Sequence, residues 1–142
     1  MHSSTVQGHV VMHLVAAGEL SLRIAVDLGY DPEDPYAVRF TFHLPGDTPV
    51  TWYFARELLV EGISRPAGEG DVHLHPVGED LTEVCVVLRS PDGDATLRAP
   101  APPLIAFLAR TDRLVPMGKE ESQVELEAQL DLILSGGCES TG

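Results

Sequence analysis

Two histidines one residue apart, His73 and His75, lie in the segment GEGDVHLHPVG over 68–78. Alternate residues of a β-strand face the same side, so both imidazoles could converge on a transition metal. A metal site needs a third or fourth ligand. The sequence offers three candidates without fixing their positions: Asp71, His43 and Glu83. The spacing matches no two-part ligand motif, so we expect no metal and keep His73 and His75 as the candidate pair.

The alternative for this segment is an ordinary short strand whose polar side carries the two histidines. Val72 and Leu74 alternate with them, and this period of two is typical of a strand with one buried face. We therefore expect Val72 and Leu74 to face the core. His73 and His75 would then face solvent or a neighbouring subunit.

Catalytic motifs are absent from the sequence. It contains no G-x-S-x-G elbow, P-loop, G-x-G-x-x-G fingerprint or H-E-x-x-H pair. Cys85 lies in the apolar run VCVVL, which predicts a buried thiol rather than a nucleophile. Cys138 follows two glycines, and we interpret both cysteines as reduced thiols of a cytosolic protein. The sequence predicts a protein that is not an enzyme and has no cofactor.

Acidic residues dominate the charge of the chain. Its 142 residues hold 22 Asp and Glu against 9 Lys and Arg, a net charge of -13, with 44% hydrophobic residues. The length and composition are typical of one globular domain. A surface this acidic repels phosphate groups, which argues against nucleic acid and anionic membranes as partners. The apolar stretch HVVMHLVAAG has no basic leader and is too short to cross a bilayer, so we expect no stable membrane insertion.

The hydrophobic pattern predicts strands, a helix, strands and a helix, followed by one more helix. The segments that alternate or read as extended are 6–15, 19–28, 36–44, 50–54, 71–76, 79–90 and 95–99. Helical spacing predicts helices over 54–62 and 100–116, the first of them ended by Gly62. We expect 64–70 to be a loop and Pro76 to end its strand. This order indicates an α+β fold built on antiparallel sheets.

The last helix is predicted over 122–137. Ser122 and Glu125 form a possible capping box at its start, and Gly136 and Gly137 are expected to close it. Its apolar positions form a stripe: Val124, Leu126, Leu130, Ile133 and Leu134. Two interpretations of the stripe stay open. It packs on the chain's own sheet, which we favour, or it forms a helix–helix seam between subunits.

Three stretches together resemble the SsgA-like proteins of sporulating, filamentous actinomycetes: DPYAVRFTFHLPGDTPVTWYFARELLVEG at 34–62, RPAGEGDVHLHP at 65–76 and PLIAFLARTDRLVPMGKE at 103–120. The resemblance implies one domain over 1–142, and we expect a flexible C-terminal tail over 136–142. We expect its motif residues to be structural: Asp34, Pro35, Tyr36, Trp52, Phe54, Arg56, Glu57, Gly62, Phe107, Arg110, Thr111 and Asp112.

The resemblance also implies a fold and a role. The fold would be two antiparallel sheets with helices, similar to the Whirly single-stranded nucleic-acid-binding fold and assembled as a homotrimer. The role would be that of a non-enzymatic adaptor in sporulation-specific cell division. It would help to place or activate the tubulin-like GTPase FtsZ at cytoplasmic division septa, together with other SsgA-like proteins.

Two other functions stay open. One is single-stranded nucleic-acid binding, suggested by the fold likeness alone. The net charge of -13 opposes it, because such binders need a basic groove with stacking aromatic residues. The other is metal binding that depends on the histidines.

Overall fold

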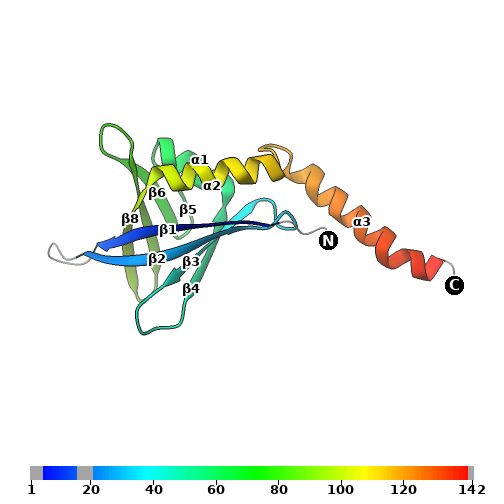
Figure 1. Cartoon of the computed structure of the whole chain (residues 1–142), viewed down its shortest axis with the longest axis horizontal. Coiled ribbons are helices and arrows are strands. Elements are labelled where there is room, and N and C mark those ends of the chain that lie inside the picture. The colour runs from blue at the N-terminus through cyan, green and yellow to red at the C-terminus, as the bar shows by residue number, and fades with distance from the viewer. Residues whose placement is uncertain (1–4, 16–20, 141–142) are drawn as a thin grey trace.

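A computed structural model describes residues 5–15 and 21–140, and the side chains of 136–140 lie outside that description. This part of the chain forms a curled antiparallel sheet with helices along one side (Figure 1). The first half contains β1 (Val6–Val15), β2 (Ser21–Tyr30), β3 (Ala37–His43), β4 (Val50–Ala55) and α1 (Arg56–Ser64). The second half contains β5 (Ala67–Glu69), β6 (Val72–Val77), β7 (Glu83–Ser90), β8 (Gly93–Pro100) and α2 (Ala101–Leu114), and α3 (Glu120–Ser140) follows. The predicted order of strands and helices is confirmed.

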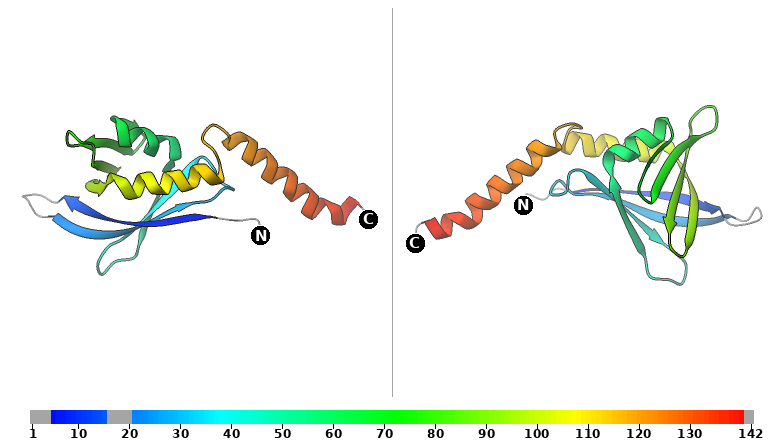
Figure 2. Two further views of the ribbon diagram at one scale, coloured as in Figure 1. Left: turned by 45° about the horizontal axis from the view of Figure 1, so that its top comes forward. Right: turned by 180° about the vertical axis from the view of Figure 1, so that it is seen from behind.

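All eight described strands belong to one sheet, in the order β4-β3-β2-β1-β8-β7-β6-β5. The two halves join where the end of β1 pairs with β8, from His13 opposite Arg98 to Val15 opposite Thr96. Beyond these three residue pairs β1 and β8 separate, and the sheet curls (Figure 2). The prediction of two sheets is therefore replaced by one continuous sheet with two four-stranded halves.

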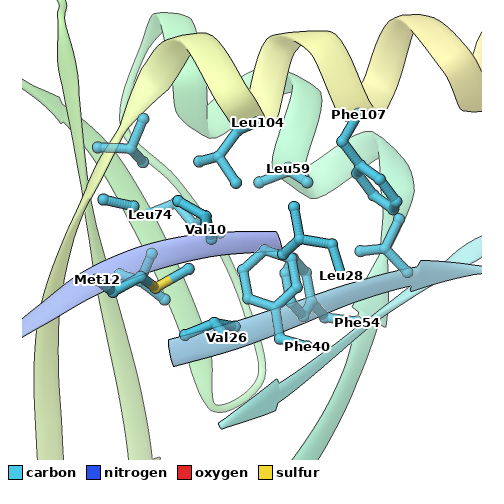
Figure 3. Close-up of a cluster of buried hydrophobic side chains, with 14 of the residues drawn as sticks. Val10, Met12, Val26, Leu28, Phe40, Phe54, Leu59, Leu74, Leu104 and Phe107 are labelled. Atoms are coloured by element: carbon cyan, nitrogen blue, oxygen red, sulfur yellow. The ribbon is translucent and has the colours of Figure 1, made fainter. Parts of the chain in front are cut away.

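Alternating apolar residues place the core on the inner face of this curl. In the first half, Val10 and Phe42 flank Val26, and Leu28 lies opposite Phe40. All five side chains are buried, and Val10, Leu28 and Phe40 lie beneath the helices (Figure 3). The helix α2 packs on β1, and α1 packs on β6. Each such side chain contributes about 1.5–3 kcal/mol of hydrophobic free energy when fully buried.

Two details of the second half differ from the prediction. The segment 64–70 is not only loop, because β5 forms within it. The strand β6 continues through Pro76 to Val77, so Pro76 does not end it. The short β5 pairs only with Val72–Leu74, which leaves Pro76 with a partner strand on one side alone. Proline is tolerated at such an edge position because it lacks only the N–H group that a second neighbour would need.

Gly62 has a role that its expected position as a helix end does not describe. The helix α1 runs through Gly62 to Ser64. A Cβ atom at Gly62 would lie 2.4 Å from the Cβ of Leu74, closer than side-chain carbons can approach. The glycine therefore lets α1 lie directly on β6, which is a packing requirement rather than a stop signal.

The start and end of α3 also differ from the prediction. The helix begins at Glu120, so Ser122 lies within its first turn and does not cap it. The N–H of Gln123 already donates to the carbonyl of Lys119 at 3.1 Å. At the other end the backbone stays helical through Gly136 and Gly137 to Ser140. The flexible tail over 136–142 stays a prediction, and its residues 141–142 lie outside the described part.

Replacing Gly62 with alanine tests the contact between α1 and β6. We expect Gly62→Ala to lower the free energy of unfolding by about 2 kcal/mol, because overpacking outweighs the gain in helix propensity. Gly8→Ala is a matched control, since its Cβ would meet its nearest neighbour, Phe107, at 3.5 Å. Chemical denaturation of both variants would measure the difference. Equal stabilities would contradict the proposed close packing.

Candidate interaction site

Arg56, the first residue of α1, is completely buried at 0% exposure. Its backbone N–H donates to the carbonyl of Tyr36 at 2.7 Å, which fixes the junction between β4 and α1. Its guanidinium lies 4.8 Å from the centre of the Tyr30 ring. A cation over the face of an aromatic ring is stabilised by the ring quadrupole. A buried arginine also needs an anionic partner, because an unpaired charge in the interior is costly.

The guanidinium of Arg56 binds the end of α2 and the start of α3. Its Nη1 donates to the carbonyl of Val115 at 2.8 Å and to the hydroxyl of Thr111 at 3.3 Å. Its Nη2 donates to Oε2 of Glu120 at 2.7 Å and forms the ion pair there. The Thr111 hydroxyl in turn donates to the carbonyl of Leu108 at 2.8 Å. Nε has no hydrogen-bond partner.

Glu120 is almost buried and remains charged. Burial by itself would raise the pKa of its carboxyl group, but the hydrogen bond from Arg56 opposes this. Further donation from the backbone of Glu120 and of Gly118 also favours the carboxylate, so its pKa is lowered. Burial raises the pKa of Tyr30 to about 12 although Arg56 lies beside it. The Tyr30 hydroxyl therefore keeps its proton and donates to the carbonyl of Pro35 at 2.9 Å.

This cluster, which we call the Arg56 node, consists of Tyr30, Arg56, Thr111 and Glu120. It connects the end of β2, the start of α1, the end of α2 and the start of α3. A further hydrogen bond, from the N–H of Met117 to Asp112 at 2.9 Å, closes the turn between α2 and α3. The node thus fixes where α3 leaves the body of the protein.

Beyond Glu120, α3 projects away from the sheet and the other helices (Figures 1 and 2). Its large apolar side chains are 36–69% exposed: Val124, Leu126, Leu130, Leu132, Ile133 and Leu134. The interpretation that the apolar stripe packs on the chain's own sheet is wrong for this structure. A solvated helix with this much apolar surface is typical of an interaction site.

The motif residues expected from the sequence fall into three groups. The Arg56 node and its hydrogen bonds include Pro35, Tyr36, Arg56, Thr111 and Asp112. The core or its border includes Trp52, Phe54, Gly62 and Phe107. The remaining residues, Asp34, Glu57 and Arg110, are exposed. Asp34 accepts a backbone hydrogen bond from Ala37 at 3.3 Å in the turn before β3.

Sequence reasoning missed Glu120 as the partner of Arg56. Arg56 begins a short helix whose next apolar residues are Leu58 and Leu59, so its side chain could be expected to be buried. A buried arginine needs a carboxylate partner. The sequence contains 22 acidic residues, so nothing in the spacing identifies which one.

The histidines do not form a joint site in the described structure. Val72 and Leu74 are buried as predicted, whereas His75 is exposed and His73 half-buried. Neither belongs to a metal-binding group, because no three His, Cys, Asp or Glu side chains among the described residues are placed to hold a metal ion. Cys85, which lies opposite His75, is buried and free as predicted. Burial raises the pKa of its thiol.

A different pair of histidines makes polar contacts on the outer face of β1–β3. The two oxygens of Asp27 contact Nδ1 of His9 at 2.6 Å and Nε2 of His43 at 2.7 Å. The hydrogen bonds from His43 and His9 lower the pKa of Asp27. The register explains the contact with His9, which lies directly opposite Asp27.

Residues 24–120 match the family model described as Streptomyces sporulation and cell division protein, SsgA. The chain belongs to the SsgA family. A relative is the sporulation-specific cell division protein SsgB of Streptomyces coelicolor, 44% identical over 136 residues, which cover 94% of this chain and 98% of that protein. The SsgB protein of Thermobifida fusca is 42% identical over 123 residues, covering 85% and 88%.

Solved structures show the same fold. A chain described with the words "Mutations in SsgB correlate to longitudinal cell division during sporulation of Streptomyces coelicolor" is 44% identical, with a TM-score of 0.81 and coverage of 87% and 98%. An SsgA-like sporulation-specific cell division protein from Thermobifida fusca is 37% identical, with a TM-score of 0.84 and coverage of 92% and 96%. In the part of this SsgA-family chain that is described, no helix is both long and apolar enough to cross a membrane.

Removing the charge of Glu120 tests the Arg56 node. We expect Glu120→Gln to lower the free energy of unfolding by about 3 kcal/mol, because it leaves a buried guanidinium without its anion. Glu121→Gln, at the next and exposed position, is the matched control and should change stability by less than about 0.5 kcal/mol. Urea denaturation would measure both values. A Glu120 variant as stable as the Glu121 variant would exclude a structural role for the pair.

The lowered pKa of Glu120 also predicts a pH dependence. A carboxyl group with a depressed pKa in the folded state stabilises the fold above its ordinary pKa of 4.5. That contribution is lost as the pH falls through the folded-state pKa. The stability difference between the wild type and Glu120→Gln should therefore be constant between about pH 5 and 7 and shrink below pH ~4.5. Denaturation curves over this range would show it, and a difference that stays constant down to pH ~3 would contradict it.

Proposed function

We propose that this SsgA-family protein is a non-enzymatic adaptor in sporulation-specific cell division and that it assembles and binds its partners through α3. Its relatives are sporulation-specific cell division proteins, which supports the process. The observation that carries the proposal is the exposed apolar surface of α3. By analogy with the resemblance described above, the partners are FtsZ and other SsgA-like proteins at cytoplasmic division septa, and the assembly is a Whirly-like homotrimer.

The large apolar residues of α3, apart from Leu134, form two stripes instead of the single stripe predicted from the sequence. At 3.6 residues per turn, Leu126, Leu130 and Ile133 lie on one side of the helix, and Val124 and Leu132 lie roughly opposite. We call these the 126-stripe and the 124-stripe. A helix that stands between two neighbours needs an apolar surface on both sides, which one packing contact with the body would not require.

The 126-stripe fits self-assembly. Its spacings of four and three residues are those of the apolar positions in a helix–helix seam. The charged side chains Glu125, Glu127 and Asp131 lie outside the stripe and can stay in water at such a seam. We therefore assign the 126-stripe to contacts between copies of this chain and the 124-stripe to the division partner.

Replacing the 126-stripe with serine tests the assembly. We expect the wild type to show three times the 15.3 kDa mass of one chain in light scattering and Leu126→Ser/Leu130→Ser/Ile133→Ser to be a monomer. The stability of the body should change little, because these side chains are exposed. The matched control is Val60→Ser/Leu81→Ser/Ile105→Ser, which changes exposed apolar residues outside α3. A wild-type monomer at micromolar concentration would disprove the trimer.

Capture experiments test the partner. We expect the immobilised wild type to retain purified FtsZ with GDP or with GTP. Val124→Ser/Leu132→Ser should lose FtsZ and keep the mass of the wild type in light scattering. The triple variant Val60→Ser/Leu81→Ser/Ile105→Ser should retain FtsZ. If the wild type captures neither FtsZ in either nucleotide state nor another SsgA-like protein, the adaptor proposal is wrong.

A further inference from the structure

An apolar cavity of about 220 Å³ opens where the β3–β4 and β7–β8 hairpins come together. This end of the curled sheet lies below the helices in Figure 1. The walls come from six strands and include Phe42, Leu44, Val50, Trp52, Leu88 and Ala95. No helix contributes to them, so the cavity is separate from α3 and from the Arg56 node.

The walls present almost no polar group to an occupant. Ser90 lies at the border, and its hydroxyl already donates to the carbonyl of Gly93 at 2.9 Å. Val50 is exposed and Trp52 half-buried, so the cavity is open at β4. An apolar cavity of about 150 Å³ can stay dry and bind a benzene ring, so this one has room for a single aromatic or branched side chain.

The border of the cavity is acidic. Asp47 lies on the loop between the wall residues Leu44 and Val50, and Asp92 lies on the turn between Ser90 and Gly93. Asp94 follows but alternates with the wall residues and pairs with Arg89 at 3.9 Å, which leaves Asp47 and Asp92 as the charges at the border. Together with the net charge of -13, these residues attract a basic group and repel an acidic one.

The charge selects among possible occupants. The apolar residues of α3 from a second copy would bring Glu125, Glu127 and Asp131 against Asp47 and Asp92, which is unfavourable. A fatty acid would place its carboxylate at the same border. A protein segment with an apolar side chain between basic residues fits both the cavity and its border.

The position of β4 adds a way to hold such a segment. In the described sheet β4 pairs with β3 only, so its outer backbone groups are open. An extended segment can add to such an edge as a further strand, with main-chain hydrogen bonds for affinity and a side-chain pocket for specificity.

We propose that this cavity binds one large apolar side chain of a partner protein, carried on an extended segment with basic residues on both sides of it. The proposal goes beyond the adaptor function and does not depend on α3. The 126-stripe and 124-stripe variants leave the cavity unchanged, so the failure of one proposal can be distinguished from the failure of the other.

The experiment uses the full chain labelled with ¹⁵N and the blocked peptide Arg-Arg-Trp-Arg-Arg as the probe. We expect the peptide to shift the NMR signals of the Trp52 indole and of the amides from Ser90 to Ala95. Replacing its central Trp with Ala should weaken binding roughly tenfold or more, because the burial of one aromatic side chain is lost. Replacing its four Arg with Glu should abolish binding.

Variants of the protein locate the site. Ala95→Met fills the cavity and should abolish peptide binding, and a melting curve checks that this variant is folded. Asp47→Asn/Asp92→Asn leaves the cavity open and should weaken binding and its salt dependence. Glu69→Gln/Glu79→Gln removes the same charge at exposed positions that do not line the cavity and should bind the peptide as the wild type does.

Four results would overturn the proposal. The first is that the Trp peptide does not bind, and the second is that the Ala peptide binds as tightly as the Trp peptide. The third is that the Glu peptide or decanoate binds as tightly as the original peptide with four Arg. The fourth is that Ala95→Met has a different mass from the wild type in light scattering. The third result would indicate a site for a small organic anion or a charge-independent ligand. The fourth would indicate that a second copy of this chain occupies the cavity.

Discussion

A fully buried guanidinium is the constraint on which the arrangement of the helices depends. Arg56 can stay in the interior only while Glu120, the Val115 carbonyl and the Tyr30 ring surround it. These groups come from parts of the chain that are far apart in sequence, so one charge requires four elements to meet at one place.

The described hydrophobic core does not include the part of α3 that follows Glu120. Every residue of the hydrophobic core that is described lies between Val6 and Val115, and the node adds Glu120 as the last buried residue of that part. The apolar side chains of α3 that are described, up to Ser135, therefore contribute nothing to the core of their own chain. If α3 binds partners as proposed, its sequence is set by those partners, whereas the sequence of the sheet is set by packing.

Local pattern predicted the strands well and the placement of α3 poorly, for a physical reason. Alternation such as Ile24, Val26 and Leu28 reports which face of a strand is buried, and the strand length follows from it. An apolar stripe such as Leu126, Leu130 and Ile133 reports that a surface will be covered but not by which molecule. The partner of Arg56 and the close approach at Gly62 also depend on residues distant in sequence. The joining of the two halves of the sheet through β1 and β8 rests on three residue pairs that carry no periodic signal.

Because α3 is attached to the body near its first residue, a small rotation there produces a large displacement of its far end. Its 21 residues span roughly 31 Å at 1.5 Å per residue. Its ion pair with the body is formed by Glu120 at the first turn. A tilt of about 10° at that point would displace the far end by about 5 Å, which is the rise of one helical turn. In the proposed assembly, the accuracy with which Arg56 orients Glu120 would thus set the register in which the helices of neighbouring copies meet, far from the ion pair itself.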